Sequence, residues 1–236
     1  MTESRGKMSL SFVLHGLAAL GALWALNFLI ATQVPVAIQG IGASYWVFFY
    51  HFGSALNSYL FFGALLVFSI RYLRSNDERF DQCARVAAEL GVLALAITVV
   101  TGAAWARGAW NRWWVWDDPR LMSASITLLV YIGYLMLQYQ VENPTQRRRW
   151  AAVMGILAFA NIPFVHYATK IFATGSHPAN LDMADSSIIA TRWFAVLAFG
   201  IFFWFLYRWK LDRDRVHDDV QRQLGAVRRL EEGKYL

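Results

Sequence analysis

The sequence predicts an all-α, polytopic membrane protein with six transmembrane helices and both termini in the cytoplasm. Of its 236 residues, 57% are hydrophobic and only 16% are charged, against roughly 45–50% and about 25% in ordinary soluble domains. Its apolar residues also gather in six runs, each close to the length of about 20 residues that a membrane helix needs. No Gly/Ser-rich or Pro-rich linker divides the chain, so we expect residues 1–236 to form a single integral membrane domain.

Each of the six runs is bounded by polar or charged residues. The first follows Arg5 and Lys7, but its apolar core is longer than that of a signal peptide and no small-residue cleavage site follows it. We therefore expect an uncleaved membrane helix. In chain order, the expected spans are Met8–Ile30, Tyr50–Ile70, Val86–Ala104, Leu121–Gln140, Trp150–Tyr167 and Trp193–Trp209.

The distribution of basic residues predicts the orientation of these spans. Seventeen of the 22 Lys and Arg residues lie in the two termini and in the connections on the same side, and five lie on the other side. Because positively charged connections are retained in the cytoplasm, we expect three outward connections, at residues 31–49, 105–120 and 168–192. The cytoplasmic arginines, including the run 147–149, either only set this topology or also dock partners.

The tail, residues 210–236, is expected to be a cytosolic amphipathic helix. Apolar residues recur there among charges at helical spacing. They are Val216, Val220, Leu224, Val227 and Leu230. Such a helix either lies on the lipid headgroups or docks a partner protein, and the sequence does not favour one of these over the other.

Charge and cysteine content exclude several classes of function. The net charge of +6 is compatible with nucleic-acid binding, but the apolar composition and the eleven tryptophans favour a lipid bilayer as the opposing surface. The single cysteine, Cys83, cannot form an internal disulfide, a Cys-x-x-Cys redox pair or a covalent Cys-x-x-Cys-His haem site. The chain also has no Gly-x-x-x-x-Gly-Lys-[Ser/Thr] loop, so any energy from ATP must come from a partner.

Five of the eleven tryptophans lie within twelve residues of the second outward connection. They are Trp105, Trp110, Trp113, Trp114 and Trp116. An aromatic belt at the membrane surface would spread its tryptophans over all helix ends, whereas this connection concentrates them. If the middle of the connection is helical, four residues share one face and form a flat apolar platform. They are Trp110, Trp113, Trp114 and Asp117.

Three arginines accompany these tryptophans. Arg107, Arg112 and Arg120 supply guanidinium forks, which match carboxylates in a bidentate way. A planar aromatic ligand with carboxylates at its edge, such as haem, satisfies both features, whereas a stacked sugar does not call for the arginines. Asp117 and Asp118 are expected to pair with the arginines or to cap the helix that starts near Leu121.

Helix rise of about 1.5 Å per residue selects the histidines that can reach this platform. His51, His166 and His177 are expected near the outer face, whereas His15 lies too deep and His217 is in the tail. A neutral imidazole binds iron through one ring nitrogen while an acceptor orients the other. Zinc is the weaker alternative, because no His-Glu-x-x-His motif is present.

Residues 105–121 resemble the tryptophan-rich WWD signature of haem-handling membrane proteins, most closely at Trp113–Asp117. With six spans and one histidine on either side of the signature, nearly the whole chain is similar to the CcmC family of cytochrome c maturation. Two departures concern the pose of the porphyrin. Trp-Ala and Trp-Asn stand where the family commonly has Trp-Gly pairs, and residues 117–120 are one residue longer than the usual Asp-x-Arg.

The resemblance implies that His51 and His177 ligate the iron of haem b axially and that the WWD-like segment cradles the porphyrin. The site would lie on the periplasmic side of the bacterial inner membrane, in a subunit that is not itself an enzyme. The implied partners are the haem chaperone CcmE, the separate ATPase CcmA, the permease CcmB and the small subunit CcmD. Haem would be held only transiently and passed to CcmE.

Three other functions remain open from the sequence. A membrane b-type cytochrome would bury histidine pairs between facing helices, but only His15 is expected well inside the membrane. A transporter or channel subunit would carry intramembrane charge, which the spans almost lack. Another haem-handling branch, such as CcsA, shares the WWD signature on a longer chain.

Overall fold

The computed structural model describes residues 10–34, 45–172 and 186–232. Within these residues it is all-helical, and six stretches are long and apolar enough to cross a membrane, so the predicted multi-pass fold is confirmed. The helices are α1 (Leu10–Gln33), α2 (Val47–Ser75), α3 (Glu78–Trp110), α4 (Pro119–Gln140), α5 (Pro144–Phe159), α6 (Asn161–Ile171) and α7 (Ser186–Glu232).

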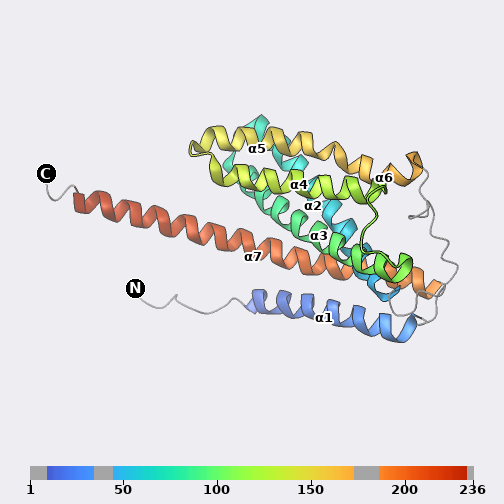
Figure 1. Cartoon of the computed structure of the whole chain (residues 1–236). Helices are drawn as coiled ribbons and strands as arrows, with labels where there is room; N and C mark the ends of the chain where they lie inside the picture. The colour runs from blue at the N-terminus through green and yellow to red at the C-terminus, as the bar shows by residue number, and fades with distance from the viewer. Residues whose placement is uncertain (1–9, 35–44, 173–185, 233–236) are drawn as a thin grey trace.

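Helix α2 lies at the centre of the bundle and packs against α3, α5 and α7, while α1 packs on α7 (Figure 1). Helix α4 packs against α3, α5 and α6. The Phe62 ring of α2 stacks on Tyr131 of α4 with ring centroids 3.7 Å apart. Gly91 of α3 makes room for it, because a Cβ there would lie 2.6 Å from the Phe62 ring. Close aromatic stacking against a small residue thus joins three helices in the core.

The fifth span is interrupted, in contrast to the single run 150–167 expected from the sequence. Helix α5 ends at Phe159 and α6 begins at Asn161, although together they form one membrane-spanning stretch. Pro163 explains the break, because it has no N–H to donate to the carbonyl of Phe159 and its ring clashes with that carbonyl. The Asn161 side chain then anchors the start of α6 by donating to Thr127 Oγ1 at 2.6 Å.

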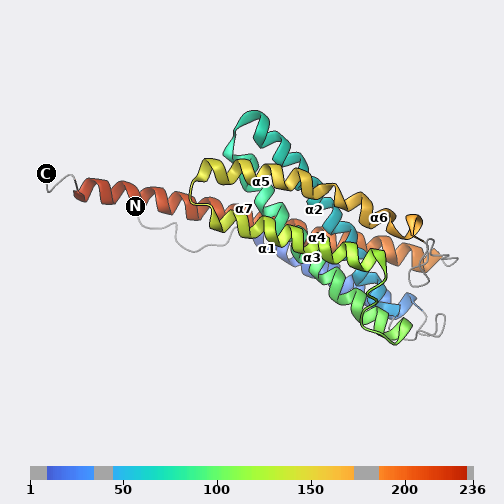
Figure 2. The ribbon, with the colours of Figure 1, turned by 45° about the horizontal axis from the view of Figure 1, so that its top comes forward.

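The last span and the tail form one helix, α7, of 47 residues, which is about 70 Å long. Its C-terminal part extends beyond the other helices in both views (Figures 1 and 2). The helical tail was predicted, but its continuity with the span was not. Two ion pairs hold α7 against α3: Arg85–Asp214, at 3.1 Å, and Glu89–Lys210. The pairs are one helical turn apart on both helices, as antiparallel packing requires.

The bundle has two chemically different ends. At one end, α1, α3 and α6 finish and α2, α4 and α7 begin; this is the tryptophan end (Figure 1). At the other, the short connections α2–α3 and α4–α5 lie near the arginines of α3 and α5; this is the arginine end. Helix α1 begins on the side toward which α7 ends, as six spans require.

Candidate functional site

The tryptophan-rich segment is not one continuous helix. Helix α3 runs six residues beyond the expected end of its span and stops at Trp110, where Asn111 caps it in the left-handed conformation (φ 55°). Residues 111–118 form bends and turns, and α4 begins at Pro119. The middle of the connection is therefore not helical, and the condition for a single helical face from Trp110 to Asp117 is not met. A left-handed residue ends a right-handed helix, and the residue before a proline avoids the helical region.

Arg107 closes this end of α3. Its guanidinium donates to the backbone carbonyl of Asn111 at 2.8 Å and also to the Asn111 side-chain oxygen. The first bond satisfies the main-chain carbonyl of the C-cap residue, which has no intrahelical donor. Arg107 therefore fixes the point at which the chain leaves α3.

The five tryptophans contain two close pairs instead of one row. The Trp105 and Trp110 rings on α3 meet edge to face at 5.2 Å, and Trp114 meets Trp116 at 6.3 Å. Trp113 and Trp116 are 63% and 77% exposed, so large apolar ring surfaces face outward. Trp114 is half-buried, and its indole N–H has no hydrogen-bond acceptor among the described residues. A contiguous exposed aromatic surface marks a place where lipid, a partner or a ligand is contacted.

The His51 ring is oriented by the main chain of α3. Its Nδ1 lies 2.9 Å from the backbone carbonyl of Thr98. Because a carbonyl only accepts, Nδ1 carries the proton and donates, which leaves the lone pair on Nε2. This is the arrangement in which a neutral histidine binds a metal ion, with one nitrogen held by an acceptor and the other directed at the metal.

Gly102 makes room for the same ring. A Cβ at this position would lie 3.0 Å from His51 Cε1 and 3.1 Å from Nδ1. Gly102 and Trp105 are three residues apart and so share a face of α3. The structure therefore brings His51 to within one helical turn of the first tryptophan. One turn toward the arginine end, the Ser54 and Thr98 hydroxyls form a buried hydrogen bond of 2.9 Å between α2 and α3.

A second group of residues gathers where α4, α6 and α2 meet. The Arg120 guanidinium donates to the backbone carbonyl of His166 at 3.1 Å. The exposed His166 ring stands edge-on to Tyr59 of α2, at 6.4 Å, and to Tyr167, at 4.9 Å. Arg120 thus ties the last part of the tryptophan segment to α6.

The two aspartates of the segment differ. Asp118 is 1% exposed and accepts from the backbone N–H groups of Arg120 and Leu121 at 2.9 and 3.1 Å. It is the N-cap of α4, so of the two roles expected for these aspartates Asp118 has the capping one. Asp117 is exposed, and so is Arg112.

A family model described as "Heme exporter protein C" (CcmC) matches residues 5–226. The chain belongs to the CcmC family. The match covers all the described residues of the tryptophan end.

Three bacterial CcmC relatives carry the name heme exporter protein C. The protein of Paracoccus denitrificans is 32% identical over 150 residues, which are 63% of this chain and 62% of that protein. That of Bradyrhizobium diazoefficiens is 29% identical over 167 residues, 70% of this chain and 63% of that protein. That of Escherichia coli K12 is 27% identical over 172 residues, 73% of this chain and 67% of that protein. The chain thus spans less than two thirds of the length of the first two relatives.

The other candidate histidines of this CcmC chain lie in different places. His177 is outside the described residues. His15 is exposed near the beginning of α1, away from the tryptophan end, and its Nδ1 lies 2.6 Å from the carbonyl of Ser11. His217 is on the extended part of α7. Neither histidine lies at the tryptophan end.

Sequence reasoning missed Arg192, which lies at the tryptophan end near the beginning of α7. Its guanidinium lies over the rings of Phe52 and Trp193, 5.2 and 5.3 Å from their centroids. Burial raises the pKa of the nearby Tyr45 hydroxyl, and the charge of Arg192 opposes this rise. The signal for Arg192 was its place as an outward arginine directly before the last apolar run. Gly102 had no distinct signal, because Gly21 also stands inside a helical run and has nothing within 4 Å of a Cβ.

Proposed function

We propose that this chain holds haem at its tryptophan end and hands it on during cytochrome c maturation. The orientation of His51 is the observation that carries the proposal, because its proton is fixed on Nδ1 and its ring lies against Gly102, one helical turn before Trp105 on α3. The family name supports it, since it describes an exporter of haem and not a catalysed reaction. A relative from Marchantia polymorpha, 26% identical over 165 residues, is named a putative cytochrome c biosynthesis ccmC-like mitochondrial protein.

In this proposal His51 and His177 bind the iron of haem b from its two faces. The exposed rings of Trp113 and Trp116 cover the porphyrin, and Trp105 and Trp110 extend this surface onto α3. The Trp114 N–H is a donor for an edge group of the ligand. Arg112 and Arg120 supply positive charge for the propionates, whereas Arg107 acts through the cap of α3.

Stacking and two imidazoles suit a protein that must release its cargo. Both interactions exchange without breaking a covalent bond, unlike a thioether link to cysteine. Cys83, the single cysteine, lies in the first turns of α3, at the arginine end, and is too far away to bind the same haem. We therefore assign the chain a carrier role in which binding is transient.

The site faces the periplasm in this proposal, because the basic connections favour a cytoplasmic arginine end. Haem would then pass to the chaperone CcmE, with energy from the separate ATPase CcmA. The permease CcmB and the small subunit CcmD complete the complex in the bacterial inner membrane. The chain itself has no phosphate-binding loop of the P-loop type.

Haem spectra of the purified full-length protein, expressed with and without CcmE, test this function. We expect His51→Ala and His177→Ala to lose most of the Soret absorbance per protein, while the matched variant His15→Ala keeps it. Thermal melting of each variant separates loss of a ligand from loss of the fold. Unchanged spectra in both His51 and His177 variants would overturn the assignment. A stable, reversible redox couple with haem that never passes to CcmE would instead favour a b-type cytochrome.

A further inference from the structure

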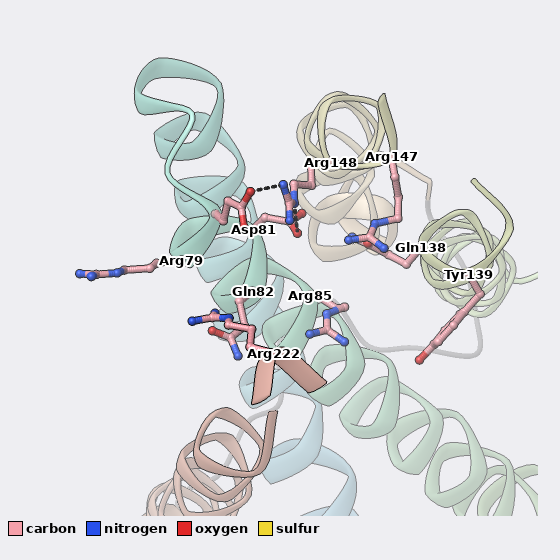
Figure 3. A pocket seen from close by; sticks show the side chains of 10 residues that line it. Arg79, Asp81, Gln82, Arg85, Gln138, Tyr139, Arg147, Arg148 and Arg222 are labelled. Carbon is pink, nitrogen blue, oxygen red and sulfur yellow. Dashed lines mark hydrogen bonds and ion pairs between the residues drawn. The ribbon is translucent and has the colours of Figure 1, made fainter. Parts of the chain in front are cut away.

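The arginine end contains a polar cavity of about 370 Å³ that the haem-carrier function does not use (Figure 3). Four helices contribute to it: α3, α4, α5 and the extended part of α7. Its ten lining residues include five arginines against two carboxylates. They are Glu78, Arg79, Asp81, Gln82, Arg85, Gln138, Tyr139, Arg147, Arg148 and Arg222. The cavity walls therefore carry an excess of positive charge.

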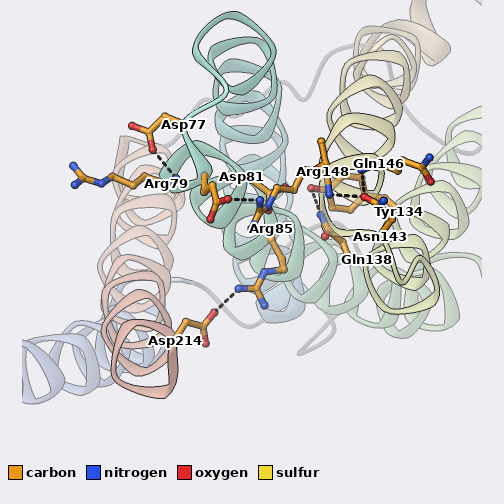
Figure 4. Close-up of polar contacts among 12 residues, drawn as sticks. Asp77, Arg79, Asp81, Arg85, Tyr134, Gln138, Asn143, Gln146, Arg148 and Asp214 are labelled. Atoms are coloured by element: carbon orange, nitrogen blue, oxygen red, sulfur yellow. Dashed lines mark hydrogen bonds and ion pairs between the residues drawn. The ribbon is translucent and has the colours of Figure 1, made fainter. Parts of the chain in front are cut away.

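Ion pairs within the protein neutralise only part of this charge. Arg148 of α5 pairs with both lining carboxylates, Glu78 and Asp81, the latter at 3.7 Å. Arg85 pairs with Asp214 of α7 at 3.1 Å (Figure 4). Asp81 also interacts electrostatically with Arg147 and Arg85, so the two carboxylates of the wall are shared among arginines that outnumber them. Guanidinium groups that crowd together without matching anions repel one another, and a bound anion relieves this repulsion.

Two hydrogen-bond donors in the wall also lack acceptors. The Nε of Arg147 and the Nε2 of Gln82 are buried and have no hydrogen-bond partner among the described residues. Figure 3 shows Arg147 on the α5 side of the cavity and Gln82 on the α3 side. Buried donors are nearly always paired in folded proteins, so each of these calls for an acceptor. A ligand with several acceptor oxygens that reaches both sides of the cavity would satisfy both.

We propose that this cavity binds a phosphate group. Guanidinium forks match the oxygens of phosphate in a bidentate way, and phosphate supplies both the negative charge and the acceptors that the wall lacks. The cavity borders the ends of apolar spans, where the exposed aromatic residues Tyr139 and Trp150 stand at the level expected for lipid headgroups. Basic pockets between helices at the cytoplasmic surface bind phosphate headgroups of anionic lipids. The phosphate thus comes from an anionic lipid or from a free phosphate in solution.

The test measures lipid retained by the purified full-length protein in bilayer discs, by native mass spectrometry. Discs contain phosphatidylcholine alone or with phosphatidylglycerol, and a separate arm adds inorganic phosphate to the phosphatidylcholine discs and follows thermal melting. We expect Arg147→Gln to lower the retention of phosphatidylglycerol roughly tenfold, the effect of one charge-assisted hydrogen bond. Arg149→Gln is the matched control, because Arg149 is exposed and next in the same arginine run but does not line the cavity.

A second variant separates a built site from general attraction to positive charge. Gln82→Leu removes a buried donor without changing the charge, so it lowers retention only if the phosphate lies in the cavity. Stabilisation by inorganic phosphate that Arg147→Gln abolishes, without preference for phosphatidylglycerol, would identify a free phosphate as the ligand.

Three results would overturn the proposal. One is equal loss of retention in Arg149→Gln and Arg147→Gln, and another is no binding of either phosphate source. The third is binding of a polyglutamate peptide that Arg147→Gln weakens while phosphate has no effect, which would make the cavity a protein dock. Haem spectra recorded on the same samples keep this test independent of the haem function.

Discussion

The two ends of the bundle position positive or proton-donating side chains by different means. At the tryptophan end, His51, Arg107 and Arg120 each donate to a main-chain carbonyl of another turn or helix. At the arginine end, Arg85 and Arg148 pair with carboxylates. A carbonyl orients a guanidinium without cancelling its charge, whereas a carboxylate does both. The tryptophan end therefore keeps its charge for an anionic ligand, and the arginine end keeps only the excess over its carboxylates.

Gly102→Val should abolish haem binding at the tryptophan end without changing the cavity at the arginine end. A branched side chain there would collide with the His51 ring, because even a Cβ would lie 3.0 Å away. Overpacking of this kind costs about 1–3 kcal/mol in stability, and the displaced imidazole should lose the haem spectrum almost completely. Absorbance per protein and thermal melting measure the two effects. Gly21→Val is the matched control, because nothing lies within 4 Å of a Cβ at Gly21. Equal loss of haem in both variants would contradict the role of Gly102.

Asp81→Asn should make the arginine end more like the tryptophan end, because it leaves more arginine charge without a carboxylate partner. Arg148 would lose one of its two carboxylate partners, Asp81, and unfolding should become easier by about 1–2 kcal/mol. The cavity would at the same time gain positive charge, so we expect more phosphatidylglycerol to be retained than in the wild type. Native mass spectrometry and thermal melting report these opposite changes. Lower stability together with lower lipid retention would show that the cavity needs Asp81 for its shape.

The spans were predictable because length and apolarity are properties of the chain alone. The place of His51 in the first turns of its helix, far from Arg71, was likewise predictable from the bounds of the span. The partner of His51 was not, because the acceptor is the main chain of Thr98 and a carbonyl carries no sequence signal. Pro163 indicates the break before α6, but the continuous apolar run around it led to the expectation of a single uninterrupted span.

The ends of helices and the arginine cavity depend on contacts between distant residues. The left-handed cap at Asn111 is held by Arg107, so the helical platform expected across residues 110–117 could be rejected only in three dimensions. The arginines at 79–85 and 147–148 are some 60 positions apart in sequence and meet only after folding. From the sequence they indicated topology or an unspecified dock, whereas the fold brings them around one cavity.

Asp214→Asn should test whether the carboxylates of the arginine end also position α7. The substitution removes the partner of Arg85, whose side chain is 32% exposed. Because partly exposed ion pairs contribute about 0–1 kcal/mol, the melting temperature should fall slightly and the difference should shrink at high salt. Thermal melting at low and high ionic strength measures it. A loss that does not depend on salt would indicate packing, not charge, as the contribution of Asp214.

Two substitutions at the cap that ends α3 separate backbone geometry from side-chain bonding, and the smaller of their effects is the smallest expected here. Asn111 has a φ of 55°, a conformation that glycine adopts freely and alanine does not. Asn111→Ala should therefore cost about 1 kcal/mol, with part of the loss due to the missing acceptor of Arg107. Asn111→Gly keeps the geometry and removes only that acceptor, so its cost should be a few tenths of a kcal/mol. If the glycine variant unfolds as easily as the alanine variant, the Arg107 bond fixes the end of α3. If it unfolds like the wild type, the left-handed turn fixes the end of α3. The Arg107 side chain is then available to a ligand at the tryptophan end.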